Sequence, residues 1–237
     1  MKTLSVESSL LWTGHLRLNA SYYEATAGRA EELLRATGFP LARLGDAGVT
    51  DRVFNPPRFK RIYVNDEAHG VPYLTGAEML TGRPEKRSFI SRALTPNLDE
   101  YVVHESWVLI TDSGTIGRSL YASRDFEGFA VTNNVIRVVA GGVPSGYLYA
   151  WVSSPPGQAL ITRDTYGSVI DHIEPHHVRN VPVPLVDRNV QRVVHDKVQR
   201  AAALRAESNR LFDEAERELL KALGTTPEEW SGRESDG

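Results

Sequence analysis

The sequence predicts an α+β fold within the broad α/β class: a strand-rich domain with peripheral helices, followed by one long C-terminal helix of coiled-coil type. From residue 49 onward, short apolar runs alternate with glycine, proline, asparagine and aspartate, which is typical of a meandering sheet. From residue 187 to 223, apolar residues recur at steps of three and four, which is typical of an amphipathic helix. A chain of 237 residues, 41% of them hydrophobic, can also bury a sizeable core.

The first expected element is a helix over residues 22–37. Ala30, Leu33, Leu34 and Thr37 fall near one face of this helix. Gly38 supplies a stop, because glycine readily adopts the left-handed conformation that ends many helices.

Short apolar runs follow as expected strands. They are rich in β-branched and aromatic residues and are bounded by turn-forming residues. These runs occupy residues 62–64, 102–103, 107–110, 129–131, 134–139, 147–152 and 180–185.

The long helix draws its apolar residues into one stripe. At 1.5 Å per residue it would extend about 54 Å, which favours a partner helix, packed closely antiparallel or within a larger assembly. The alternative is that the stripe packs on the helix's own domain. The stripe comprises Val190, Val194, Val198, Ala201, Leu204, Ser208, Leu211, Ala215, Leu219 and Ala222. Partner contacts are expected from its larger members, Val190, Val194, Val198, Leu204, Leu211 and Leu219.

Composition excludes several classes of site. The chain has no cysteine, which rules out disulfides, thiolate metal sites and cysteine nucleophiles. The first seven residues carry no apolar block long enough for a signal peptide, and no later run approaches about 18 apolar residues, so a cytoplasmic location and no membrane contact are expected. The net charge of −3 does not favour nucleic-acid binding, because such proteins usually carry a basic excess. Residues 52–92, however, carry eight basic and four acidic residues. That window, which includes Lys60 and Arg61, either faces phosphates or is an ordinary solvated surface.

Two polar segments are candidates for contacts with DNA. Residues 113–118 present Ser113, Thr115 and Arg118 around two glycines, and such a turn either contacts phosphates and base edges or only joins two strands. Asn133 and Asn134 precede an apolar run, and asparagine can pair with adenine through two hydrogen bonds. An Asx turn is the competing explanation for these asparagines.

Signals for autonomous catalysis are weak. Asn55-Pro56-Pro57 is similar to the Asn-Pro-Pro-aromatic motif of amino-group DNA methyltransferases, but Arg58 stands where the aromatic residue belongs. No glycine-rich cofactor loop, nucleophile elbow or phosphate-binding loop is present. The histidines and carboxylates of residues 171–177 suggest zinc, yet Pro175 interrupts a shared helix face. We therefore expect no catalytic residues, no cofactor and no metal.

The order of the motifs resembles the target-recognition domain of a type I restriction-modification specificity subunit. The resemblance covers roughly residues 100–195: a strand, the 113–117 turn, the 132–134 approach, a short helix at Tyr147-Leu148, a loop at 166–168 and an exit at 180–185. It implies that the 163–168 loop lies near DNA, with Arg163, Tyr166 and Ser168 as contacts. Arg163 would read guanine, hold a phosphate or pair with Asp164. Residues 184–191 depart from the family's exit sequence, which leaves docking to a standard methyltransferase subunit open.

The resemblance implies a non-catalytic DNA-recognition subunit that directs a partner adenine methyltransferase, and possibly a restriction subunit, to a bipartite site in double-stranded DNA. Residues 1–185 would form the recognition domain, 186–223 a dimerisation and spacer helix, and 224–237 a short capped turn with a disordered acidic tail. Because one recognition domain and one long helix are present, a homodimer of half-subunits is expected. The alternatives are a stand-alone or degenerate methyltransferase, and a protein-interaction adaptor acting through the long helix.

Overall fold

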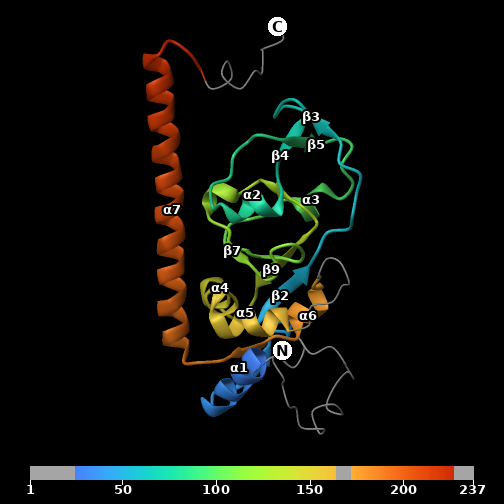
Figure 1. Ribbon diagram of the computed structural model, residues 1–237, viewed down its shortest axis with the longest axis vertical. Coiled ribbons are helices and arrows are strands. Elements are labelled where there is room, and N and C mark those ends of the chain that lie inside the picture. The colour runs from blue at the N-terminus through green and yellow to red at the C-terminus, as the bar shows by residue number, and fades with distance from the viewer. Residues whose placement is uncertain (1–24, 164–171, 227–237) are drawn as a thin grey trace, which may run out of the picture.

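A long helix, α7, runs along one side of a mixed α/β domain (Figure 1). The structure is a computed structural model that describes residues 25–163 and 172–226. It confirms the fold class expected from the sequence, with several sheets, peripheral helices and one long C-terminal helix.

Three sheets are formed within the described residues. The central antiparallel sheet has the order β2-β9-β6-β7, with β2 at Thr50–Phe54, β9 at Val135–Ala140, β6 at Val108–Thr111 and β7 at Ser119–Tyr121. A second sheet has the order β3-β5-β4-β8, with β3 at Tyr63–Val64, β5 at Phe89–Ser91, β4 at Gly70–Leu74 and β8 at Ala130–Val131. A two-stranded sheet pairs β1 (Leu41–Arg43) with β10 (Pro182–Pro184).

Helices flank these sheets. They are α1 (Ala25–Ala36), α2 (Gly76–Leu80), α3 (Leu98–Tyr101), α4 (Ser145–Ser153), α5 (Pro155–Thr162), α6 (Pro175–Arg179) and α7 (Arg188–Ala222), with a 3-10 turn η3 (Arg124–Phe126). The main apolar core lies between the central sheet and α1, α4, α5 and α6, and the base of α7 packs against it.

Most of the expected strands are present, but two are wrong. Residues 147–152 lie inside the helix α4, and Val102 makes only an isolated bridge to Ala130. The run at 147–152 is apolar on every side because α4 is covered by both the central sheet and α7. A short run buried all round has no periodicity that separates a strand from a helix. The family resemblance, which implies a short helix at Tyr147-Leu148, placed this element correctly.

The buried face of α1 differs in part from the expected one. Ala27, Ala30 and Leu34 are buried, whereas Leu33 is 57% exposed and Thr37 is exposed. Leu33 lies next to Leu34 in sequence, and the 100° step between neighbouring helical residues turns it away from the core. Gly38 has φ +70°, as expected for a glycine that ends a helix.

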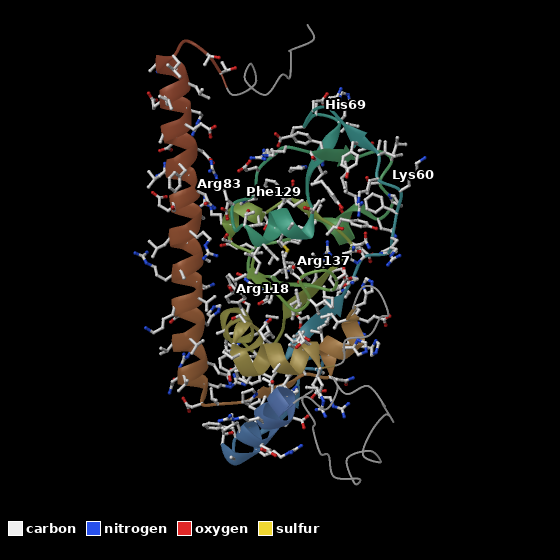
Figure 2. All side chains as sticks on the ribbon, viewed as in Figure 1. Lys60, His69, Arg83, Arg118, Phe129 and Arg137 are labelled. Carbon is white, nitrogen blue, oxygen red and sulfur yellow. The ribbon has the colours of Figure 1, made fainter. Side chains whose placement is uncertain are left out.

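Arg137 on β9 is fully buried in the middle of the domain (Figure 2). Its guanidinium donates to four backbone carbonyls: those of Thr132 at 2.9 Å, Val131 at 2.5 Å, Tyr101 at 3.3 Å, and Val135. Burial lowers the pKa of Arg137 to about 10, which still leaves the side chain charged at neutral pH. A charged donor thereby joins the loop before β9, the strand β8 and the end of α3.

The long C-terminal helix is confirmed close to its expected limits. Asp187 caps its N-terminus by accepting a hydrogen bond from the Asn189 amide at 2.8 Å, and Gly224 follows its end with φ +71°. Val194, Val198 and Ala202 pack the base of α7 against the core.

At the crossing of α4 and α7, Gly146 allows the two backbones to approach closely. A Cβ at Gly146 would lie 2.8 Å from the His195 carbonyl oxygen, and the Gly146 amide donates to His195 Nδ1 at 3.0 Å.

The Gly146→Ala variant is expected to lose about 1–3 kcal/mol of unfolding free energy in urea, because the added methyl group must push the helices apart. Gly28→Ala in α1 is the control, since a Cβ there meets no atom within 4 Å. That change is expected to stabilise the protein by about 0.5–1 kcal/mol. Equal effects at the two glycines would contradict the close approach.

Along its whole length, α7 leaves a second apolar face uncovered within the described residues. At 100° per residue, its members fall on one stripe about a third of the helix circumference wide, beside the face that packs on the domain. Each member is at least 50% exposed: Val190, Val193, Leu204, Leu211, Phe212, Leu219 and Leu223. We call this set the α7 stripe.

The helix residues expected to contact a partner therefore divide into two groups. Val194 and Val198 pack on the protein's own domain, as the alternative interpretation held. Val190, Leu204, Leu211 and Leu219 belong to the α7 stripe. The sequence pattern merged two neighbouring helix faces into one.

Candidate nucleic-acid interface

The turn between β6 and β7 has the tight conformation that its glycines allow. Gly114 and Gly117 have φ of +70° and +74°, and the Gly117 amide donates to the Thr111 carbonyl at 2.9 Å. Residues with a Cβ resist this conformation, which explains both glycines. The turn exposes Thr115 and Arg118.

The two ends of this turn face different neighbours. Ser113 forms a β-bridge with His172, whereas the Gly117 carbonyl accepts from Gln158 of α5 at 2.5 Å. The end of the turn at Gly117, next to Arg118, therefore lies against α5, and Ser113 lies beside His172.

Asp112 and Asn55 lie next to Ser113. The Asn55 amide nitrogen donates to Asp112 Oδ2 at 2.8 Å, which joins the loop after β2 to the end of β6. Burial raises the pKa of Asp112, and hydrogen bonds from Ser113 and Asn55 and the charges of His172 and Arg58 oppose that rise. The oxygen of Asn55, Oδ1, and the other carboxylate oxygen of Asp112, Oδ1, are buried and find no hydrogen-bond partner among the described residues.

Hydrogen bonds within the domain hold the segment Asn55-Pro56-Pro57 in place. The Asn55 amide is engaged by Asp112, and the Pro57 carbonyl accepts a hydrogen bond from the Tyr101 hydroxyl. Both groups belong to the structural framework.

The segment after Pro57 carries the exposed cations of this region. Arg58, Lys60 and Arg61 are exposed, and Figure 2 shows Lys60 on the side of the domain away from α7. Arg61 Nη2 donates to Thr132 Oγ1 at 3.3 Å, and its guanidinium lies 5.5 Å from the ring centre of Tyr73. These contacts place Arg61 beside the 132–134 segment.

The two asparagines have different surroundings. Asn133 is buried and its amide donates to Asn134 Oδ1 at 2.7 Å, so the expected direct contact of Asn133 with a base does not fit this structure. Asn134 is half-buried, and its carbonyl accepts from the Asp112 amide at 3.1 Å. Asn133 thus supports Asn134 rather than reaching outward.

A continuous set of contacts therefore connects the basic segment to the β6 end of the central sheet. It runs from Arg61 through Thr132 and Asn134 to Asp112, and from there to Ser113 and His172. We define the candidate surface by its outward members: Arg58, Lys60, Arg61, Ser113, Asn134 and His172. Arg58 and His172 were not among the expected contacts. The sequence signals for them were the basic window at 52–92, which includes Arg58, and the histidine-rich segment at 171–177, which includes His172.

Arg163 does not belong to the candidate surface. Its Nη1 lies 2.5 Å from Glu31 Oε1, in a pair that is mostly shielded from solvent and joins α5 to α1. This ion pair, which forms when α1 packs on α5, stands in place of the expected contact with guanine or phosphate. The alternative role, a pair with Asp164, falls outside the described residues. Tyr166 and Ser168 also lie outside the described residues.

The basic window at 52–92 does not form one surface. Lys86 pairs with Glu67 at 2.6 Å and Arg87 pairs with Glu85, and both cations line a hollow beside α7. Arg52 pairs with Glu100 at 3.3 Å on the edge of the central sheet. Only the 58–61 part of the window contributes to the candidate surface.

The histidine-rich segment around α6 forms contacts of its own. His177 Nδ1 accepts from the Glu174 amide at 2.9 Å, and His176 Nδ1 lies 3.0 Å from Glu174 Oε2. In the part of the chain that the structure describes, no group of three or more His, Asp or Glu side chains is placed to hold a metal ion.

Solved structures with a similar arrangement come from type I restriction-modification systems. One is a chain from a study of complex assembly and conformational transition of the type I R-M system, with 20% identity and a TM-score of 0.49 over 85% of this chain and 51% of that chain. The HsdS subunit from Thermoanaerobacter tengcongensis has 20% identity and a TM-score of 0.48 over 79% and 47% of the two chains. The S subunit from M. genitalium has 14% identity and a TM-score of 0.39 over 67% and 37%.

The chain spans about half the length of the first two of these structures. Neither a protein-family model nor a curated protein matches the sequence.

The candidate surface combines the kinds of group that contact nucleic acid. Lys60 and the two arginines supply positive charge, which attracts phosphates without regard to sequence. Asn134, Ser113 and His172 supply hydrogen-bonding groups that suit base edges.

No helix in the described ranges could cross a membrane, since even α7 carries charged residues along its whole length.

Proposed function

We propose that the chain is a non-catalytic, sequence-specific DNA-recognition subunit of a type I-like restriction-modification system. One observation carries the proposal. The basic segment with Lys60 lies on the side of the domain away from α7, while α7 leaves an apolar stripe uncovered. DNA and a partner helix can then be bound at the same time. The order of the motifs over residues 100–195, which resembles that of type I specificity subunits, is the reason for proposing this kind of system.

We further propose that the α7 stripe pairs with the same stripe of a second copy. A twofold dimer would present two candidate surfaces to DNA and would recognise a bipartite, symmetric site. In this proposal residues 1–185 form the recognition domain and residues 186–223 the dimerisation and spacer helix. A partner adenine methyltransferase would supply S-adenosylmethionine and the chemistry, with a restriction subunit as a further partner.

The pairing predicts a change of oligomeric state when charge enters the α7 stripe. Replacing Leu204 and Leu211 with glutamate is expected to convert the dimer into a monomer in sedimentation equilibrium, raising the dissociation constant at least about 100-fold because four carboxylates would meet at one interface. Leu33→Glu with Leu94→Glu is the matched control, because both leucines are more than half exposed elsewhere on the domain. Loss of the dimer in the control as well, or a dimer that persists in the α7 variant, would contradict the prediction.

The test of the whole proposal is selection from a random duplex library by the purified protein at two salt concentrations. Enrichment of a split, palindromic motif would support a dimeric DNA reader. If only salt-sensitive bulk binding or no binding is found, the selection is repeated with the modification subunit added. Failure to enrich a motif in that second selection would reject DNA recognition.

An adaptor that acts only through α7 is the second candidate, because the uncovered stripe would serve it equally well. Charge reversal at Lys60 and Arg61 separates the two functions. In an adaptor, the charge reversal would leave partner binding and function unchanged. In a DNA-recognition subunit, it would leave partner binding unchanged and abolish DNA binding.

A further inference from the structure

The far half of α7 is held to the domain by polar side chains. Asn209 Nδ2 donates to the Gly82 carbonyl at 2.9 Å and to Asp125 Oδ2 at 2.6 Å. Arg83 Nη2 lies 2.7 Å from Asp213 Oδ1. We call these five residues the distal contact. It joins the loop after α2 and the turn η3 to α7, about 15 residues beyond Val194, or roughly 22 Å along the helix.

The helix comes close to the domain at this contact. A Cβ on Gly82, which has φ +71°, would lie 3.2 Å from the Arg205 side chain. The Arg83 guanidinium also lies 6.0 Å from the ring centre of Phe212, and its hydrogen bond with Asp213 raises the pKa of Arg83. Figure 2 shows Arg83 between the domain and α7.

Between the packed base and the distal contact lies a hollow of about 730 Å³. Its helix side is formed by small or polar residues, among them Gln199, Ala202, Ala203 and Ala206, and its domain side includes Tyr121 and Ser123. Beyond Ala202, where the packed base ends, apolar packing therefore does not hold this middle part of α7 against the domain. The angle between helix and domain depends on the base and on the distal contact.

The distal contact is of a kind that can open. The side chains of Arg83 and Asp213 are 35% and 56% exposed. Ion pairs at such exposure contribute little to stability and are screened by salt. The base of α7, which is apolar, would stay packed when the distal contact opens.

We propose that Arg83 and Asn209 are positioning residues that set the number of base pairs between the two half-sites. This inference rests on the proposed function, in which two α7 helices join two recognition domains. A change in the angle between domain and helix would then move each candidate surface along the DNA. At the distal contact, about 22 Å along the helix from Val194, a tilt of about 9° moves α7 by about 3.4 Å relative to the domain, which is comparable with the rise of one base pair.

The first measurement is a distance in the protein without DNA. Because the chain has no cysteine, spin labels can be placed at Ala68→Cys on the domain and Glu218→Cys on α7, both at exposed positions. Labelled protein is diluted with unlabelled protein so that only the distance within one chain is read. The unsubstituted background is expected to give one narrow distribution, and the Arg83→Ala/Asn209→Ala variant a distribution several times broader.

Arg210→Ala is the control on the same helix. Arg210 pairs with Glu207 at 2.6 Å and with Glu214, both within α7, so its removal should leave the distance distribution narrow. Equal distributions in the double variant and the control would overturn the positioning role. This result does not depend on DNA binding.

The second measurement is library selection with the same three proteins. The double variant is expected to keep the half-site sequence and to accept spacers at least one base pair longer and shorter, while the Arg210→Ala control keeps one spacer. A broadened distance distribution with an unchanged spacer would overturn the inference and leave DNA recognition intact. If the unsubstituted protein enriches no split motif even with the modification subunit, the proposed function fails and the inference fails with it.

Discussion

Replacing Lys60 and Arg61 together with alanine is expected to weaken duplex DNA binding by on the order of tenfold or more and to flatten its salt dependence. Each phosphate contact contributes about 0.9 to the slope of log K against log salt, so the slope should fall by about 2. Both side chains are exposed on the candidate surface, and Lys60 lies on the side of the domain away from α7. A salt titration of the binding constant, followed by fluorescence anisotropy, measures both quantities.

The control for this prediction removes the same charge elsewhere. Lys86 and Arg87 lie in the same basic window of the sequence, but they line the hollow beside α7 and pair with Glu67 and Glu85. Their replacement with alanine is expected to change the slope by less than half as much. Equal slopes for the two double variants would mean that DNA responds to net charge alone, and the candidate surface would be wrong.

Replacing Arg137 with methionine is expected to remove about 3–5 kcal/mol of unfolding free energy, a large share of the 5–15 kcal/mol of an ordinary domain. Methionine fills a similar volume but leaves four buried carbonyls without their donor. Unfolding in urea followed by circular dichroism gives the free energy. The Arg137→Lys variant, which keeps the charge and some of the donors, should have an unfolding free energy between that of the unsubstituted protein and that of Arg137→Met.

Arg118→Met serves as the comparison at an exposed position and is expected to change stability by less than about 0.5 kcal/mol. A loss at Arg137 no larger than that at Arg118 would show that hydrogen bonding by the buried guanidinium does not hold the sheet together. Because Arg137 donates to the loop at 132–135, its loss is also expected to disturb Asn134 on the candidate surface.

The two regions proposed to bind partners differ in the forces that they offer. The candidate surface offers charge and hydrogen bonds, which suit a highly charged, solvated molecule such as DNA. The α7 stripe offers leucine, valine and phenylalanine side chains, whose burial against another helix is favourable. In our proposal, the distal contact fixes the angle between α7 and the domain, and this angle determines where the candidate surface meets the DNA.

Much of the site could not be predicted because its contacts join residues far apart in the chain. Arg163 pairs with Glu31, Arg61 reaches Thr132, and Asn55 holds Asp112. A sequence pattern shows which residue types are present. It does not show whether an arginine contacts DNA or pairs with a glutamate on another helix. Asn133 and Asn134 are adjacent and identical in type, yet one is buried and the other is partly exposed.

The sequence by itself determined the elements whose signal is local. The periodicity over residues 187–223, with Asp187 before it and Gly224 after it, specified α7, and Gly114 and Gly117 specified the turn between β6 and β7. Neighbours within a few residues decide such features, because helix and turn conformations depend on local backbone sterics and hydrogen bonds. Only the tertiary structure decided that Val198 faces the domain while Leu204 faces solvent, that Arg163 pairs with Glu31, and that Arg137 is buried. Those outcomes depend on which surfaces meet when the chain folds, and burial is set by that packing rather than by any residue's neighbours in sequence.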